Sequence, residues 1–471
     1  MHPESLPVAV IGGGPVGLAA AAHLVERGLE PVILERGNQV GANIAEWGHV
    51  RFFSPWRYSV DRAAANLLEG SGWVSPDPDS YPTGADLIEQ YLRPLASLPA
   101  MRDRIRYGTD VLSVTREGFD KMKSPGREDT PFLVTVRTAT GHEDTVLARA
   151  VIDASGTWTH PNPVGASGTP AIGERGLQHR IAYGIPDVLG KSRERYAGKR
   201  ILVVGSGHSA FNVLLDLVDL AASEPDTRIT WVIRKPAEHT ANLFGGGIAD
   251  ALPARGELGS RVRQLVEHGK LHLVTGLNIT KLAGTPGGIV VSGLDGRDLP
   301  AVDEIIAATG FRPDLAPLSE LRLALDPAVE SPVALAPLID PNVHSCGSVP
   351  PHGAVELSHP ERDFYIAGMK SYGRAPTFLM LTGYEQVRSI AAAIAGDWES
   401  ARDVQLVLPE TGVCSSGAVL GERGVACCDT AATTGDDSCC GETATTGGCC
   451  GDSAPQLIQL TAATSRQGSC C

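Results

Sequence analysis

Residues 12–17 read G-G-G-P-V-G, and the fold class follows from this stretch together with the segments on either side of it. Gly12, Gly14 and Gly17 fill the pattern G-x-G-x-x-G. In such a turn the first glycine permits a tight bend, the second lets the backbone approach a pyrophosphate, and the third lets a helix pack closely on a strand. The helix that begins here presents its partially positive amino end to the phosphates. The stretch therefore predicts a dinucleotide site.

The flanks of this turn supply the βαβ unit that the pattern needs. Residues 7–12 predict an apolar strand, residues 15–27 are rich in Ala and Leu and predict a helix, and residues 31–35 predict the next strand. Glu35 ends that second strand, where a carboxylate accepts hydrogen bonds from ribose hydroxyls. We include the adjacent Arg36 in the predicted cofactor site. This context favours a nucleotide site over an ordinary glycine turn.

The same layout begins again at residues 205–210, which read G-S-G-H-S-A. The third glycine is replaced by alanine, which the pattern permits. The residues that we assign to this turn are Gly205, Gly207, Ser209 and Ala210. The following strand ends in Arg234 and Lys235, so no carboxylate repels a 2′-phosphate there and two cations are available to bind one. This ending favours NADPH over NADH, the alternative being a solvated strand end.

Length, charge and hydropathy exclude several classes of protein. The chain has 471 residues and a formal net charge of -14, so two or three domains fit and nucleic acid is not an expected partner. No run of 18 apolar residues occurs, so we expect no transmembrane helix and no membrane partner. The first residues lack the pattern of a secretory signal, which makes the cytoplasm the expected compartment.

These motifs together resemble those of flavoproteins with two dinucleotide-binding domains. The group includes the flavin-containing monooxygenases, the N-hydroxylating monooxygenases and the pyridine nucleotide–disulfide reductases. The similarity covers about residues 7–396. Besides the two glycine turns, the matching segments are D-A-S-G at 153–156, A-A-T-G-F at 307–311, Y-I-A-G at 365–368 and G-Y-E-Q at 383–386. The resemblance implies FAD on the first turn, NADPH on the second, and Gly368 and Gly383 in the segment that closes the FAD site.

The resemblance implies an α/β fold with two Rossmann-like dinucleotide-binding domains, and the composition of the last residues adds a disordered Cys-rich C-terminal tail. We expect a discontinuous FAD-binding domain from residues 1–165 and 320–400. Residues 166–319 would form the NADPH-binding domain and residues 401–471 the flexible tail. From about residue 412 the composition turns to Gly, Ala, Ser, Thr and Cys, which cannot bury enough apolar surface to fold alone. We also assign Trp47 to the flavin site, the alternative being packing within its loop.

Nine of the ten cysteines lie after residue 410, a distribution unlike that of a disulfide framework. Eight of them form adjacent pairs: Cys427, Cys428, Cys439, Cys440, Cys449, Cys450, Cys470 and Cys471. Adjacent thiols suit soft ions such as Cu(I), trivalent arsenic or mercury better than zinc. Such tails resemble those of arsenic and mercury resistance proteins, in which a terminal cysteine pair captures the ion. The alternative is a low-complexity tail with no selected role.

Three functions stay open at the level of the sequence. No C-x-x-C or C-x-x-x-x-C occurs in residues 1–413, and the monooxygenase fingerprint F-x-G-x-x-x-H-x-x-x-(W/Y) is matched only at its end, by His179 and Tyr183. We predict an FAD- and NADPH-dependent oxidoreductase, foremost a flavin monooxygenase acting on a small soft or nucleophilic substrate. The alternatives are a flavin reductase of a thiophilic ion or disulfide delivered by the tail, and a non-enzymatic sequestering protein. We assign no catalytic residue, and a homodimer is the one assembly that we keep open.

Overall fold

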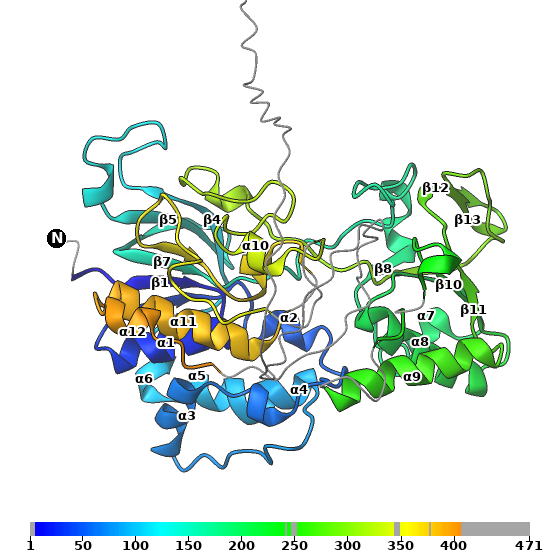
Figure 1. Ribbon diagram of the computed structural model, residues 1–471, viewed down its shortest axis with the longest axis horizontal. Coiled ribbons are helices and arrows are strands. Elements are labelled where there is room, and N and C mark those ends of the chain that lie inside the picture. The colour runs from blue at the N-terminus through cyan, green and yellow to red at the C-terminus, as the bar shows by residue number, and fades with distance from the viewer. Residues whose placement is uncertain (1–4, 241–242, 246–251, 343–348, 376–377, 407–471) are drawn as a thin grey trace, which may run out of the picture. The chain divides into compact units, whose positions relative to one another are not determined.

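The first glycine turn follows the central strand of a parallel sheet made of short apolar strands (Figure 1). The computed structural model describes residues 5–240, 243–245, 252–342, 349–375 and 378–406. The sheet has the order β15-β7-β1-β2-β3. Its strands are β1 (Val8–Ile11), β2 (Pro31–Leu34), β3 (Ile105–Arg106), β7 (Ala150–Asp153) and β15 (Phe364–Ile366). All residues of β1, β2 and β7 are buried, as expected for a parallel sheet covered on both faces.

Helices cover one face of this sheet and a second sheet covers the other. The helical face is formed mainly by α1 (Pro15–Glu26), α3 (Arg62–Glu69), α5 (Arg93–Ser97) and α11 (Met380–Ile394). The four consecutive alanines of α1 are fully buried, and small side chains allow α11 to pack closely beside it (Figure 1). On the other face lies the antiparallel sheet of β4 (Thr109–Arg116), β5 (Phe132–Thr138) and β6 (Glu143–Ala148). Gly28 follows the end of α1, and its φ of 72° suits a glycine at this position.

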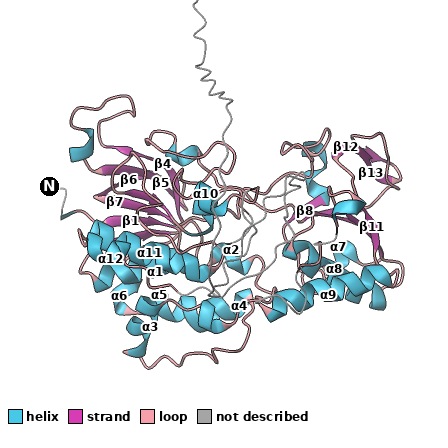
Figure 2. Cartoon of the chain, viewed as in Figure 1, coloured by secondary structure: helices cyan, strands magenta, loops and turns pink. Residues whose placement is uncertain are grey.

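A second parallel sheet repeats the plan around the second glycine turn (Figure 2). Its order is β11-β10-β9-β14-β8. The strands are β8 (Ile181–Tyr183), β9 (Arg200–Val204), β10 (Arg228–Val232), β11 (His272–Val274) and β14 (Glu304–Ala307). One face packs on α8 (His208–Ser223) and α9 (Pro253–Glu267). The other face packs on the hairpin of β12 (Ile279–Thr285) and β13 (Gly288–Gly293).

The remaining α-helices of the described residues are short. They are α2 (Ala42–Ala45), α4 (Gly84–Leu87), α6 (Pro99–Arg102), α7 (Arg193–Tyr196), α10 (Ala336–Ile339) and α12 (Trp398–Arg402). None of the helices in the described ranges is long and apolar enough to cross a membrane.

The predicted α/β fold with two Rossmann-like units is confirmed by the two parallel sheets. The chain divides into the units Met1–Val419 and Leu420–Cys471, and both sheets belong to the first. Most of the predicted tail lies outside the described residues, and so do all eight paired cysteines. The domain boundaries that we expected from the sequence stay a prediction.

Candidate nucleotide-binding sites

The three glycines of the first turn have three different surroundings. Gly12 has a φ of +101°, and a Cβ on it would lie 2.9 Å from the Ala154 carbonyl oxygen. A Cβ on Gly17 would lie 1.9 Å from the carbonyl oxygen of Gly12. A Cβ on Gly14, by contrast, would meet no atom within 4 Å. The first and third glycines are therefore required by the fold, whereas the second faces open space at the amino end of α1, where a phosphate would approach.

Glu35 is held beside this turn at the carboxyl end of β2. Its Oε2 accepts a hydrogen bond of 2.6 Å from the backbone N–H of Gly13, and its Oε1 accepts one of 2.6 Å from that of Gly37. The carboxylate is thus ordered where a ribose would lie next to a pyrophosphate. Arg36 follows with an exposed side chain, and its contact with a cofactor stays a prediction.

Gly368 and Gly383 come together at the first turn of α1. Gly368 has a φ of +70°, and a Cβ on it would lie 3.3 Å from the Val16 side chain. A Cβ on Gly383 would lie 2.7 Å from Val16 Cγ2 and 3.6 Å from the Cα of Gly368. The segment after β15 and the first turn of α11 therefore meet the first turn of α1. Their role in closing an FAD site stays a prediction.

A buried network that the sequence did not reveal holds Gly368 in place. Gln386 Oε1 accepts a hydrogen bond of 2.8 Å from the Gly368 N–H, and its Nε2 lies 2.9 Å from both Ser371 Oγ and His352 Nε2. Burial lowers the pKa of His352, which favours the neutral ring. His352 Nδ1 donates to the Pro350 carbonyl at 3.0 Å, so Nε2 accepts from Gln386. The network joins residues too far apart in sequence to form a motif.

Trp47 belongs to an aromatic cluster with side chains from the two segments that follow β7 and β14. Its ring centroid lies 5.5 Å from that of Phe52 and 6.2 Å from that of Trp158. Trp158 in turn stacks on Phe311 at 4.5 Å. Trp47 is half-buried and packs against the first core. These contacts account for the packing of Trp47, and its contact with the flavin stays a prediction.

The second glycine turn repeats the geometry of the first. Gly205 has a φ of +132°, and a Cβ on it would lie 2.2 Å from the Ala308 carbonyl oxygen. A Cβ on Gly207 would meet no atom within 4 Å. Ala210 is fully buried and its methyl group belongs to the second core, at the position where the first turn has Gly17. Ser209 lies with it in the first turn of α8. This turn also offers open space at a helix amino end.

Arg234 follows β10 next to the second turn and is exposed. Its Nη1 donates a hydrogen bond of 3.1 Å to the carbonyl oxygen of Ala166. Lys235 beside it is partly buried. The two cations therefore stand at the carboxyl end of the strand that follows the turn, which is where a 2′-phosphate would be bound.

The loop that carries Ala166 is held by Glu174, which the sequence did not single out. Glu174 is 1% exposed and accepts hydrogen bonds from the backbone N–H groups of Val164, Gly165 and Ala171 at 2.9, 3.2 and 2.7 Å. It also accepts a hydrogen bond of 2.7 Å from Tyr183 Oη. Burial, with the Glu174 carboxylate beside it, raises the pKa of Tyr183. The half-matched monooxygenase fingerprint therefore supplies a loop anchor in Tyr183 and an exposed side chain in His179.

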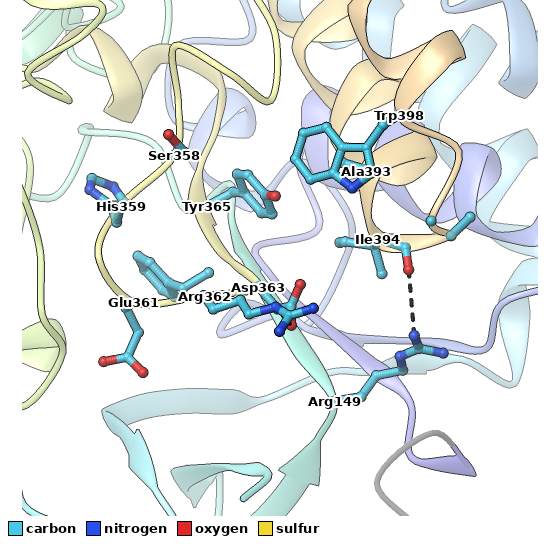
Figure 3. A pocket seen from close by; sticks show the side chains of 13 residues that line it. Arg149, Ser358, His359, Glu361, Arg362, Asp363, Tyr365, Ala393, Ile394 and Trp398 are labelled. Carbon is cyan, nitrogen blue, oxygen red and sulfur yellow. Dashed lines mark hydrogen bonds and ion pairs between the residues drawn. The ribbon is translucent and has the colours of Figure 1, made fainter. Parts of the chain in front are cut away.

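The pocket in Figure 3 lies at the amino ends of β7 and β15 in the first sheet. It is lined by Arg149 before β7, by Tyr365 on β15 and by Trp398 after α11. Arg149 Nη2 donates to the Ile394 carbonyl at 3.4 Å across it. Ligands of open parallel sheets bind at the carboxyl ends of the strands, so this pocket is not the cofactor site.

No group of three or more potential metal ligands occurs among the described residues. The eight cysteines that we assigned to metal lie outside those residues. Their role stays a prediction from the sequence.

The two turns fit dinucleotides through the same three features: an open second glycine, a helix amino end, and polar residues just after the following strand. They define the class of flavin- and pyridine-nucleotide-dependent oxidoreductases. The family model described as pyridine nucleotide-disulphide oxidoreductase matches residues 9–334, and the chain belongs to this family. Flavin monooxygenases and reductases of this family use FAD and NADPH.

Individual relatives carry the names of several activities. The chain is 30% identical over 213 residues to indole-3-pyruvate monooxygenase YUCCA1 of Oryza sativa subsp. japonica, and the match covers 44% of each chain. It is 25% identical to the ferredoxin–NADP reductase of Thermus thermophilus, over 74% of this chain and 86% of that one. Bacillithiol disulfide reductase Bdr (YpdA) from Bacillus cereus is similar in fold, with a TM-score of 0.59 and 20% identity, over 83% of this chain and 99% of that one. The match thus spans less than half the length of the rice monooxygenase.

Proposed function

We propose that the chain is an NADPH-dependent flavin monooxygenase that acts on a small soft or nucleophilic substrate. The observation that carries this proposal is the pair of glycine turns, each with open space at its second glycine. Named monooxygenases among the relatives support it. A further support is the sequence of residues 1–413, whose single cysteine, Cys346, cannot form the redox pair that a disulfide reductase of this kind needs beside its flavin.

The residues of this chain would bind and orient two cofactors. Residues 12–17 would hold the pyrophosphate of FAD, and Glu35 would bind its ribose. Because Gly368 and Gly383 have no side chain, their backbone can come close to the first turn of α1. Residues 205–210 would hold NADPH. Bound FAD would supply the redox chemistry, accepting a hydride from NADPH and using it to activate oxygen.

We assign the preference for NADPH to Arg234 and Lys235. A guanidinium binds a phosphate through charge-assisted hydrogen bonds, and Arg234 already has one of its nitrogens fixed on Ala166. A planar donor held in this way loses less freedom when it binds a phosphate than a free side chain would.

The test is to follow the oxygen that the FAD-loaded enzyme consumes with NADPH. With labelled oxygen and a panel of thioethers, amines and hydroxylamines, the proposal expects label in an oxidised product and little peroxide. Peroxide in the full amount of the oxygen consumed, with every substrate of the panel, would contradict it. NADH in place of NADPH serves as the matched control for the second site.

The four cysteine pairs favour a second candidate, in which the tail delivers a thiophilic ion or its own disulfide to the reduced flavin. The segment before the tail is fixed to α11, the helix that also carries Gly383. Arg388 Nη1 donates to the Ser400 carbonyl at 2.8 Å, and Glu385 Oε1 accepts from the Gln405 N–H at 3.2 Å. Removal of residues 412–471 distinguishes the candidates. A monooxygenase keeps its turnover, a reductase loses it, and a sequestering protein loses ion binding without any turnover to lose.

A further inference from the structure

A buried lysine lies at the carboxyl edge of the first sheet. Lys370 is 3% exposed, and its Nζ lies 2.7 Å from Asp153 Oδ2 and 3.1 Å from Ser155 Oγ. Asp153 is 1% exposed, and its Oδ1 accepts hydrogen bonds from the N–H and the hydroxyl of Ser155 at 3.1 and 2.6 Å. The ammonium is thus held between the end of β7 and the turn after β15.

This ion pair adjoins the first glycine turn. Asp153 is in register with Ile11 at the end of β1 and with Ile366 at the end of β15. The next residue, Ala154, brings its carbonyl oxygen so close to Gly12 that a Cβ there would lie 2.9 Å away. Since ligands of such sheets bind at this edge, the charges of Asp153 and Lys370 stand beside the predicted path of an anionic dinucleotide.

The two charged groups are buried, so solvent does not screen their electrostatic effect on a bound dinucleotide. A buried carboxylate without a partner is costly, and it repels a nearby pyrophosphate more strongly than an exposed one would. Lys370 compensates Asp153 and leaves the carboxylate free to fix the backbone of Ser155. The ion pair therefore holds residues 153–155 close to the Gly12 turn, and it adds no net negative charge to the site.

We propose that Lys370 is a positioning residue of the FAD site and that it acts by compensating the buried charge of Asp153. The proposal rests on the assignment of FAD to the first glycine turn. A flavin that takes a hydride gains two electrons and one proton and so becomes more negative by one charge. An uncompensated Asp153 would disfavour both the binding of FAD and its reduction.

The test uses the full chain with Lys370→Met and measures two properties, the FAD dissociation constant and the midpoint potential of the bound flavin. We expect FAD to bind more weakly by on the order of tenfold or more, and the potential to fall. In the double variant Asp153→Asn/Lys370→Met, the introduced amide keeps the Oδ1 acceptor for Ser155 but carries no charge. The FAD affinity of this variant should return to within about threefold of the wild type, and its potential should recover.

Arg116→Met is a control for the loss of a buried cation that leaves no carboxylate uncompensated, because Arg127 Nη2 also lies 2.8 Å from Oε2 of the buried Glu361. Arg116 Nε lies 2.8 Å from Glu361 Oε1, before the amino end of β15. This variant should lose stability but keep the affinity and potential of the wild type. Should Lys370→Met fail to fold without FAD, the double variant alone decides the matter, since the proposal requires it to fold and to bind FAD.

Three outcomes would overturn the proposal. Wild-type affinity and potential in Lys370→Met would show that the lysine only stabilises the fold. A double variant as weak as the single one would make Lys370 a direct contact of the cofactor instead of a partner of Asp153. A wild-type protein that binds no FAD at all would overturn the cofactor assignment itself, which the first two outcomes leave intact.

Discussion

The three glycines of the first turn differ in what a side chain would meet, and this difference separates folding from binding at single residues. Gly14→Ala adds its methyl group to open space, with a φ of -83° that alanine readily adopts. We expect the cofactor-free protein to keep its stability and to lose FAD affinity. Gly17→Ala drives a methyl group into the Gly12 carbonyl oxygen and should destabilise the fold by about 3 kcal/mol. Thermal unfolding and FAD titration of both variants check this, and equal stability of the two would contradict it.

The preference for NADPH also depends on single side chains. Arg234→Gln removes the charge next to the expected 2′-phosphate and should raise the KM for NADPH by about tenfold to hundredfold. The KM for NADH, which has no 2′-phosphate, should stay unchanged. Arg228→Gln is the control, because Arg228 is an exposed arginine at the start of β10, the strand that Arg234 follows. Steady-state kinetics with both nucleotides decide the matter, and an equal loss with NADPH and NADH would remove Arg234 from the phosphate site.

At the scale of elements, the sequence predicted those strands and helices whose pattern lies within a few neighbouring residues. The helix expected at residues 15–27 spans Pro15–Glu26, and the strand expected at residues 31–35 spans Pro31–Leu34. The contacts that complete the site were beyond such reasoning. Lys370 and Asp153 are 217 residues apart, and nothing in either neighbourhood indicates the pairing. Glu174 likewise gains its role from a loop that only the folded chain brings around it.

The helix α8 carries a charged group whose titration should be visible in the stability of the protein. Burial, with Asp219 and Asp187 adding to it, raises the pKa of Asp216 to about 6. The folded state therefore holds a proton that the unfolded state releases near its ordinary value of 3.8. The stability that this group contributes is present below that value and is lost as the pH rises toward 6.

Asp216→Asn should accordingly raise the midpoint of thermal unfolding at pH 7. At pH values below the ordinary pKa of the carboxyl group, the variant and the wild type should converge, because the wild-type group is then neutral in both states. Thermal unfolding at the two pH values checks the sign. A variant that is less stable at pH 7 would show that the charged form of Asp216 is stabilised by its surroundings.

At the scale of the whole molecule, two sheets of the same plan each bring a glycine turn to the carboxyl ends of their strands. The sequence predicted this duplication because the pattern in each turn is local, whereas the closing segment at Gly368 and Gly383 was implied only by resemblance. The two sites share no residue among those that we assign to them. Each ligand should therefore stabilise the protein through its own turn.

A crossed design tests this independence. A ligand at a hundred times its dissociation constant stabilises the folded state by about 2.7 kcal/mol, which raises the unfolding midpoint by a few degrees. Gly14→Ala should abolish the rise caused by FAD and keep the rise caused by NADP⁺, whereas Gly207→Ala, which also meets open space, should do the reverse. If either variant lost both responses, the prediction of independent sites would be wrong. The two ligands would then share one site or bind cooperatively.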